Sequence, residues 1–436
     1  MLPFVFWKRV EFAHMTGRTG VIVSLSLFLC LLTIFVASPV RTSYDSRWSL
    51  HTAMSIVRGH SGDLSEYIAG AKPGQRYQFE YVNGTPRTIY PIGAPLLAVP
   101  AVAAADWLIP GFEDELRAGV PLGFEAAVAS FYGAAACVIF FWLIFDQFRS
   151  ASIALATTVI FALGTSMWST ATRGLWQHGP LALMLVAAML LLSLARRRPA
   201  LIQYASLPLA LAYLMRPTAI IPIAAITAFV LVRYRPWFVR YIAWAMLVAV
   251  PWIVFNYYVY GAPLPTYYQG SWWPKPLGFW ETLLGSLISP SRGLFVFSPV
   301  LIFAATGLFL ALRDPEQRPL HLAYGIAILG QLILLGRFPY WWGGHSFGPR
   351  LLSDIVPFLV YFIAFNFRLP ARFGNATQVA VSTCIAILAI VSVLIHAQGA
   401  LRTEPWMWNV SPNNIDQNVS RVWDWSDMQF MRTRNR

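Results

Sequence analysis

An aspartate lies just beyond the first apolar stretch of the chain. Residues 20–38 are mostly apolar, and Asp45 follows in the segment Ser-Tyr-Asp-Ser-Arg-Trp at 43–48. A carboxylate held at the end of an apolar helix can act as a general base and take a proton from a hydroxyl group. The alternative is a solvated loop aspartate or a local ion pair with Arg47. Two other acidic residues of the same region are reserve candidates for the base, namely Asp63 and Glu66.

Cationic side chains stand at the ends of several other apolar stretches. Arginine offers paired donors that match the oxygens of a phosphate, and histidine adds a further donor. Cations that meet near the membrane surface would therefore suit the phosphate headgroup of a lipid, whereas an isolated arginine can simply extend its head to interfacial water. Asp354 follows Arg350 by four residues, a spacing that favours an ion pair within a helix. The candidate phosphate ligands are Arg173, His178, Arg216, Arg292, His345 and Arg350.

Aromatic residues crowd the same regions of the sequence. Flat rings can stack on sugar faces, although aromatic belts at the membrane interface explain many of them. The candidates for stacking on a sugar or an acceptor are Tyr267, Trp272, Trp341 and Trp342. The three cysteines lie in separate apolar runs, which predicts neither a disulfide framework nor a zinc site. The sequence also lacks a dense carboxylate cluster of the kind that magnesium prefers, so no protein-bound metal is expected.

The elements that must position these side chains are apolar helices. The chain has 436 residues, of which 57% are apolar and 12% charged, whereas an average soluble chain carries about 25% charged residues. A membrane span needs roughly 20 mostly apolar residues. The sequence therefore predicts an all-α, polytopic membrane protein with about 11 transmembrane helices. The expected spans are 20–38, 124–145, 151–168, 179–195, 201–215, 217–232, 240–260, 295–312, 320–336, 351–367 and 376–397.

The distribution of arginine predicts how these helices are oriented. Short connections rich in arginine mark the cytoplasmic side, together with the N-terminal segment; they lie at 196–198, 233–240, 313–318 and 368–372. The net charge of +13 is assigned to this effect rather than to nucleic acid, because no basic run exceeds three residues. The other connections are then expected on the outer face, at 39–123, 169–178, 261–294, 337–350 and the tail 398–436.

One apolar segment does not fit this pattern. Counting residues 92–109 as a span would break the charge alternation, and glycine, proline and aspartate interrupt the segment. We expect a re-entrant or juxtamembrane helix in the first outer loop, which is possible where protein covers the backbone. The alternative is a true span. On the preferred interpretation, residues 1–397 form the transmembrane domain with its first outer loop at 39–123, and residues 398–436 form an outer-face tail.

The order of several short segments resembles the GT-C superfamily of membrane glycosyltransferases. The resemblance covers roughly residues 20–400 and is greatest to bacterial relatives of the dolichyl-phosphate-mannose protein mannosyltransferases. It is carried by the order of the segments rather than by any single motif. These segments are the first-loop aspartate, Tyr-Pro-Ile-Gly-Ala-Pro at 90–95, Leu-Met-Arg-Pro-Thr at 214–218, Asn-Tyr-Tyr at 256–258 with Gly-Ala-Pro at 261–263, the run 291–299, and the run 341–350.

The resemblance implies an enzyme that moves a sugar from a polyprenyl-phosphate carrier to a lipid, glycan or protein acceptor. The reaction would take place at the periplasmic face of a bacterial inner membrane and would invert the anomeric centre. Asp45 would match the family's first-loop acidic residue, the base, and Ser46 stands where many relatives carry a second acidic residue. No cofactor is required for such a donor, although a divalent cation could assist. The expected partners are the donor, the acceptor and the membrane, with no nucleic acid.

Two other classes of protein remain open. A lipid or sugar transporter, or a flippase, would need polar residues near the middle of its spans, and here those positions are overwhelmingly apolar. An enzyme similar to the O-antigen ligases would also use arginine and histidine at a lipid phosphate. Such an enzyme would lack a first-loop aspartate as its base.

The arginine distribution and the odd number of spans predict a cytoplasmic N-terminus and an external C-terminus. A reporter that is active only in the cytoplasm should be inactive when fused after Arg436 and active when inserted within 233–238. Cytoplasmic activity of the reporter at Arg436 would contradict this topology.

Overall fold

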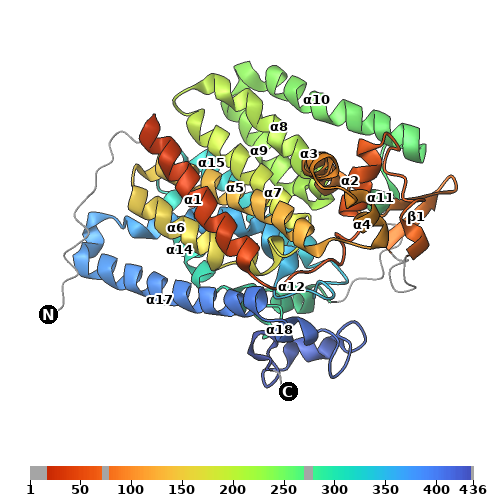
Figure 1. Ribbon diagram of the computed structural model, residues 1–436. Coiled ribbons are helices and arrows are strands. Elements are labelled where there is room, and N and C mark those ends of the chain that lie inside the picture. The colour runs from red at the N-terminus through yellow and green to blue at the C-terminus, as the bar shows by residue number, and fades with distance from the viewer. Residues whose placement is uncertain (1–16, 71–77, 270–277, 434–436) are drawn as a thin grey trace.

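The protein is almost wholly helical in a computed structural model, which describes residues 17–70, 78–269 and 278–433 (Figure 1). A short antiparallel hairpin joins β1 (Phe79–Val82) to β2 (Thr85–Thr88). The helices are α1 (Arg18–Ala37), α2 (Ser49–Val57), α3 (Gly93–Leu108), α4 (Phe112–Ala118), α5 (Leu122–Phe148), α6 (Ala151–Leu163), α7 (His178–Leu194), α8 (Ser206–Met215), α9 (Ile220–Arg233), α10 (Arg235–Tyr260), α11 (Thr266–Gln269), α12 (Phe279–Ile288), α13 (Leu294–Phe297), α14 (Phe303–Ala311), α15 (Arg318–Leu335), α16 (Val356–Ile363), α17 (Gly374–Leu401) and α18 (Glu404–Met407).

The long helices have the length and composition of membrane spans. Within the described residues, six helical stretches are long and apolar enough to cross a membrane, or seven if a bent pair counts as one span. They include α1, α5, α10, α15 and the stretches built around α16 and α17. The other expected spans correspond to shorter apolar helices, several of which are extended by 3₁₀ turns, such as Pro199–Ala205 before α8. The predicted all-α membrane fold is confirmed.

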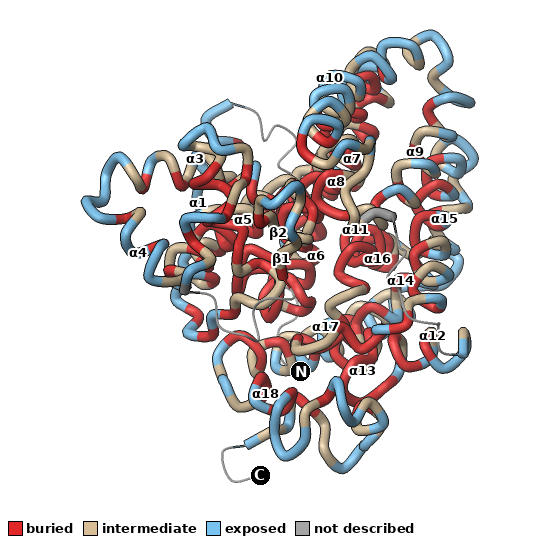
Figure 2. Tube along the Cα trace, turned by 90° about the vertical axis from the view of Figure 1, so that its right-hand side faces the viewer, coloured by how far each residue is buried: buried red, intermediate tan, exposed pale blue. Residues whose placement is uncertain are grey.

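The helices divide into an inner and an outer set. Most residues of the apolar parts of α5 and α16 are buried, whereas α1, α10 and α17 leave most of theirs exposed (Figure 2). The exposed side chains of the outer set are apolar, for example Leu25, Leu247 and Leu394. Large exposed apolar surfaces need an apolar partner, so these helices present the surface that the hydrocarbon of a bilayer would cover.

The first loop folds as a small helical cap at one end of the molecule. In Figure 1 its elements α2, α3, α4 and β1 gather at the right-hand end, together with α11. The expected helix at 92–109 is present as α3, and the chain then bends by 116° into α4. Arg58 at the end of α2 holds this bend, because its Nη2 lies 2.9 Å from Asp106 and 2.6 Å from Glu113. The segment is thus a bent pair of helices rather than one straight span.

The arginine-rich connections meet at the opposite ends of the helices. Asp146, near the end of α5, pairs with Arg196 and Arg197 after α7. Arg368, before α17, lies 6.0 Å from the ring of Phe148. These contacts place several of the basic connections on one side, as the charge pattern predicts. The connections that carry the candidate site residues lie at the other side.

Candidate active site

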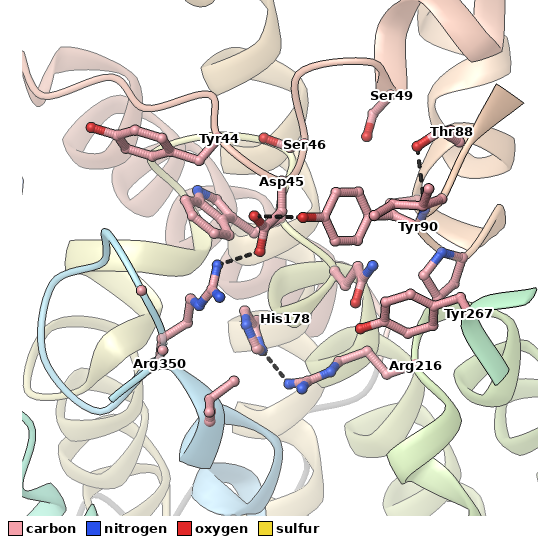
Figure 3. Close-up of a pocket in the computed structure, with 18 of the residues that line it drawn as sticks. Tyr44, Asp45, Ser46, Ser49, Thr88, Tyr90, His178, Arg216, Tyr267 and Arg350 are labelled. Carbon is pink, nitrogen blue, oxygen red and sulfur yellow. Dashed lines mark hydrogen bonds and ion pairs between the residues drawn. The ribbon is translucent and has the colours of Figure 1, made fainter. Parts of the chain in front are cut away.

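A cavity of about 810 Å³ opens among the connections expected on the outer face (Figure 3). Its walls come from the loop after α1, the β1–β2 hairpin and the start of α3, the start of α7, the turn between α8 and α9, the segment after α10, the loop before α16 and the C-terminal tail. The ionisable or aromatic lining residues are Tyr44, Asp45, Glu80, Tyr90, Trp176, His178, Arg216, Tyr267, Phe338, Tyr340, His345, Arg350 and Asp416. Segments far apart in the sequence therefore bring an acid, arginines and histidines to one space.

Asp45 is held by two donors on the cavity wall. Its Oδ2 accepts a hydrogen bond from Arg350 Nη1 at 2.6 Å, and its Oδ1 accepts one from the hydroxyl of Tyr90 at 2.9 Å (Figure 3). The side chain of Asp45 is still 27% exposed, against 12% for that of Arg350. Asp45 thus takes part in a long-range ion pair across the cavity, with Arg350.

A second cluster of charge lies on the other side of the cavity. Arg216 Nη1 lies 2.9 Å from Asp354 Oδ1 and 2.9 Å from His178 Nδ1, which is itself 3.1 Å from the same carboxylate oxygen. The hydroxyl of Thr218 donates to Asp354 Oδ2 at 3.1 Å. Asp354 is buried, while Arg216 and His178 line the cavity. The buried carboxylate of Asp354 therefore orients Arg216 and His178, two potential phosphate ligands.

The predicted ion pair between Arg350 and Asp354 is not the arrangement found. Both residues lie in a 3₁₀ helix, Arg350–Ile355, rather than in an α-helix. With about three residues per turn, side chains four apart no longer share a face. Arg350 therefore turns to Asp45 and Asp354 turns to Arg216.

Aromatic rings surround the ion pair. The guanidinium of Arg350 lies 4.5 Å above the ring of Trp176, a cation–π contact that favours its orientation towards Asp45. The rings of Tyr267 and Tyr90 lie with their centroids 5.9 Å apart and their planes tilted by 57°. Burial raises the pKa of Tyr267 and of Tyr44, so both hydroxyls remain protonated at neutral pH. Rings and hydroxyls of this kind can contact both the faces and the edges of a sugar.

A buried glutamate ties the Asp45 loop to the loop before α7. Glu125, in the first turn of α5, has no exposed surface. Its Oε1 accepts a hydrogen bond from Ser46 Oγ at 2.5 Å and one from the amide of Leu175 at 2.9 Å. The neighbours of these two partners, Asp45 and Trp176, both reach into the cavity. Ser46 stands at the position where the resemblance led us to expect a second acidic residue. It instead contacts an acidic residue of α5, Glu125.

Glu125, Tyr90 and Trp176 were not among the predicted site residues. Glu125 carried a usable signal, because an acidic residue inside an otherwise apolar span is costly and marks a functional position by default. Tyr90 and Trp176 gave no such signal, since interfacial aromatics are common in membrane proteins.

Two of the predicted phosphate ligands lie outside the lining of the cavity. Arg173 is fully buried and donates to the backbone carbonyls of Phe35, Ser38 and Val40, which joins the end of α1 to the loop before α7. Arg292 is also buried, and its donors are engaged by backbone carbonyls and side-chain amides. Both guanidinium groups are therefore occupied by the protein itself, and the predicted phosphate role does not fit their positions.

The remaining candidates also divide by position. Tyr267 and His345 line the cavity, whereas Trp341 and Trp342 pack in an apolar cluster with the C-terminal tail. Trp272 lies outside the described residues.

The reserve bases do not reach the cavity. Asp63 accepts from the amide and hydroxyl of Ser65, and Glu66 pairs with Arg117 on the surface of the first loop. Within the described residues, no group of three or more His, Cys, Asp or Glu side chains is arranged to hold a metal ion.

The fold of the chain is similar to those of two solved structures. ArnT from Cupriavidus metallidurans superposes with a TM-score of 0.54 and 13% sequence identity, over 95% of this chain and 76% of that chain. The oligosaccharyltransferase of Archaeoglobus fulgidus superposes with a TM-score of 0.53 and 13% identity, over 95% of this chain and 60% of that one. No protein-family model and no curated protein sequence matches the chain. The chain has the fold of the GT-C superfamily, as the sequence segments predict.

The two kinds of arginine should respond differently to truncation. Arg350→Ala removes a cavity donor, and loss of a charged hydrogen bond of about 1.5–3 kcal/mol should weaken binding of a polyprenyl phosphate about 10- to 100-fold. Arg173→Ala leaves three backbone carbonyls without this partner and should chiefly lower the midpoint of thermal unfolding. Both quantities are measured on purified protein in detergent, with Arg372→Ala at the opposite side as the control. Equal loss of binding in the Arg350 and Arg372 variants would contradict the assignment of the cavity.

Proposed function

We propose that this protein is a glycosyltransferase that moves a sugar from a lipid-linked donor to an acceptor hydroxyl in the cavity, with Asp45 as the base. The observation that carries the proposal is the meeting of Asp45 with Arg350, Arg216 and His178 at one cavity. The donor is a polyprenyl-phosphate sugar, the acceptor is a lipid, glycan or protein, and the reaction faces the periplasm of a bacterial inner membrane. The fold shared with a known oligosaccharyltransferase supports a reaction of this class.

The cations of the cavity suit the phosphate of such a donor. As the glycosidic bond breaks, negative charge grows on the phosphate oxygens, and donors fixed in advance stabilise that charge most effectively. Arg216 and His178 are fixed by Asp354, and Arg350 is fixed by Trp176 and Asp45. Such donors can serve a monophosphate leaving group without a cofactor, although a divalent cation could still assist.

Donor binding would also release Asp45 to act as the base. Arg350 Nη1 donates to Asp45 Oδ2 at 2.6 Å. A phosphate arriving beside Arg350 gives the guanidinium a second anionic partner, which weakens its hold on the carboxylate. Asp45 would then be able to accept the proton of the acceptor hydroxyl while Tyr90 still orients its other oxygen. Tyr267 and Tyr90 offer ring faces for the sugar.

The proposed step is a single displacement. The acceptor O–H gives its proton to Asp45, and the acceptor oxygen forms a bond to the anomeric carbon of the donor sugar. The bond between that carbon and the phosphate oxygen breaks, and its electron pair stays on the phosphate. The products are the glycosylated acceptor, with inverted configuration, and the lipid phosphate. The concentration of polar side chains at one end of the helices supports this reaction over transport through the membrane.

Asp45→Asn should abolish transfer while the protein still folds and still binds lipid phosphate. Asparagine keeps the shape of the side chain but cannot take a proton, and a general base contributes about 10²–10⁴-fold in rate. The assay follows release of labelled sugar from a panel of polyprenyl-phosphate sugars by purified protein with membrane-derived acceptors. Asp63→Asn, in the same loop but outside the cavity, is the matched control. Turnover of Asp45→Asn close to that of the parent, or a comparable loss in Asp63→Asn, would rule out Asp45 as the base.

A further inference from the structure

The loop that delivers Arg350 has no regular secondary structure of its own. Residues 337–349 connect α15 to the 3₁₀ helix that begins at Arg350, and they form no helix or strand. Gly343, Gly344 and Gly348 all have positive φ, between 61° and 74°. Glycine adopts this conformation freely but loses more conformational freedom on folding than any other residue. The buried backbone polar groups of the loop also need partners from elsewhere.

Several of those partners come from one arginine and two residues of the C-terminal tail; another is Thr170, whose hydroxyl donates to the carbonyl of Phe347 at 3.1 Å. Arg292 donates from Nε to the carbonyl of Trp342 at 2.6 Å and from Nη2 to the carbonyl of Gly344 at 3.2 Å. The amide nitrogens of Asn409 and Gln429 both donate to the carbonyl of Ser346, at 3.1 and 2.8 Å. The Oε1 of Gln429 accepts from the amide of Gly348 at 3.0 Å.

The three side chains that hold the loop also hold one another. Arg292 donates from Nη1 to Gln429 Oε1 and from Nη2 to Asn409 Oδ1, both at 2.7 Å. All three residues are at most 1% exposed. The guanidinium also lies 5.2 Å over the ring of Trp408, which has no exposed surface. A buried polar network of this kind is stabilising only when its members are satisfied together, so removal of one member loosens the rest.

The tail also reaches the cavity itself. Asp416 is part of the cavity wall; its Oδ1 accepts from the indole nitrogen of Trp342 at 2.8 Å, and its Oδ2 lies 3.4 Å from His345 Nε2. His345 Nε2 is also 3.1 Å from the side-chain oxygen of Asn414. In Figure 1 the tail, which includes α18, lies beneath α12.

We propose that the C-terminal segment 402–433 is a positioning element of the active site, which through Asn409 and Gln429 holds the loop 342–350 so that Arg350 and His345 face the cavity. This inference rests on the proposed function, because it assigns the tail to the same lipid-phosphate site. If the tail releases the loop, Arg350 occupies its position only part of the time. The apparent affinity for the donor is then the intrinsic affinity multiplied by the fraction of protein in which the loop holds Arg350 at the cavity. Bound donor restores the competent loop, so the rate at saturation is largely kept.

The experiment compares Gln429→Ala and Asn409→Ala with the parent protein and with Trp425→Ala, an exposed residue of the same tail. Amide hydrogen exchange of residues 343–348 should accelerate in the first two variants and remain unchanged in the third. The donor KM should rise about tenfold, while kcat should stay within about twofold of the parent value. Undecaprenyl phosphate alone should bind about tenfold more weakly.

Unchanged loop exchange together with unchanged undecaprenyl phosphate binding in the Gln429 and Asn409 variants would overturn the inference. A fall in kcat with no change in donor KM would also overturn it, because general loss of folded protein has that signature. If the parent itself transfers no sugar, the proposed function fails. The exchange and binding measurements would then still decide whether the tail holds the loop.

Discussion

The ion pair between Asp45 and Arg350 is the contact on which the site depends. It joins residues 305 positions apart in the chain, one just after the first membrane helix and one at the start of the stretch around α16. A carboxylate and a guanidinium this close in a partly buried space hold each other strongly. The first-loop cap, the loop before α7 and the glycine-rich loop before Arg350 must all be in place for the pair to form. The cavity is therefore a product of the whole fold rather than of any one segment.

Buried ionisable side chains around this pair hold the cavity loops in place. Taking a charge out of water is costly unless it is paired and hydrogen-bonded. Glu125 fixes the Asp45 loop, Asp354 fixes Arg216 and His178, and Arg292 joins the glycine-rich loop to the tail. Arg173 does the same for the end of α1. The charges that face the cavity are thus oriented by a layer of charges that never reach it.

Hydropathy and arginine distribution were sufficient to predict a polytopic helical membrane fold, because lipid demands long apolar helices. The order of short segments predicted the GT-C fold. The loop positions predicted that six cationic residues would gather near Asp45, and four of them, His178, Arg216, His345 and Arg350, line the cavity with it. The sequence could not separate Arg173 and Arg292 from Arg216 and Arg350, since all four end apolar stretches. What distinguishes them is the long-range acceptor: backbone carbonyls for the first two, and the carboxylates of Asp354 and Asp45 for the others. The partner of Asp354 was missed because a 3₁₀ helix replaces the α-helix that its spacing from Arg350 suggested.

The most direct test of this account is a density map of the protein with a bound polyprenyl phosphate. The account predicts phosphate density between Arg350, Arg216 and His178, within hydrogen-bond distance of at least two of them. Arg350 should also move away from Asp45, so that the separation between Arg350 Nη1 and Asp45 Oδ2 exceeds 2.6 Å. A phosphate seated outside this cavity, or one seated inside it with the contact between Asp45 and Arg350 unchanged, would contradict the central claim.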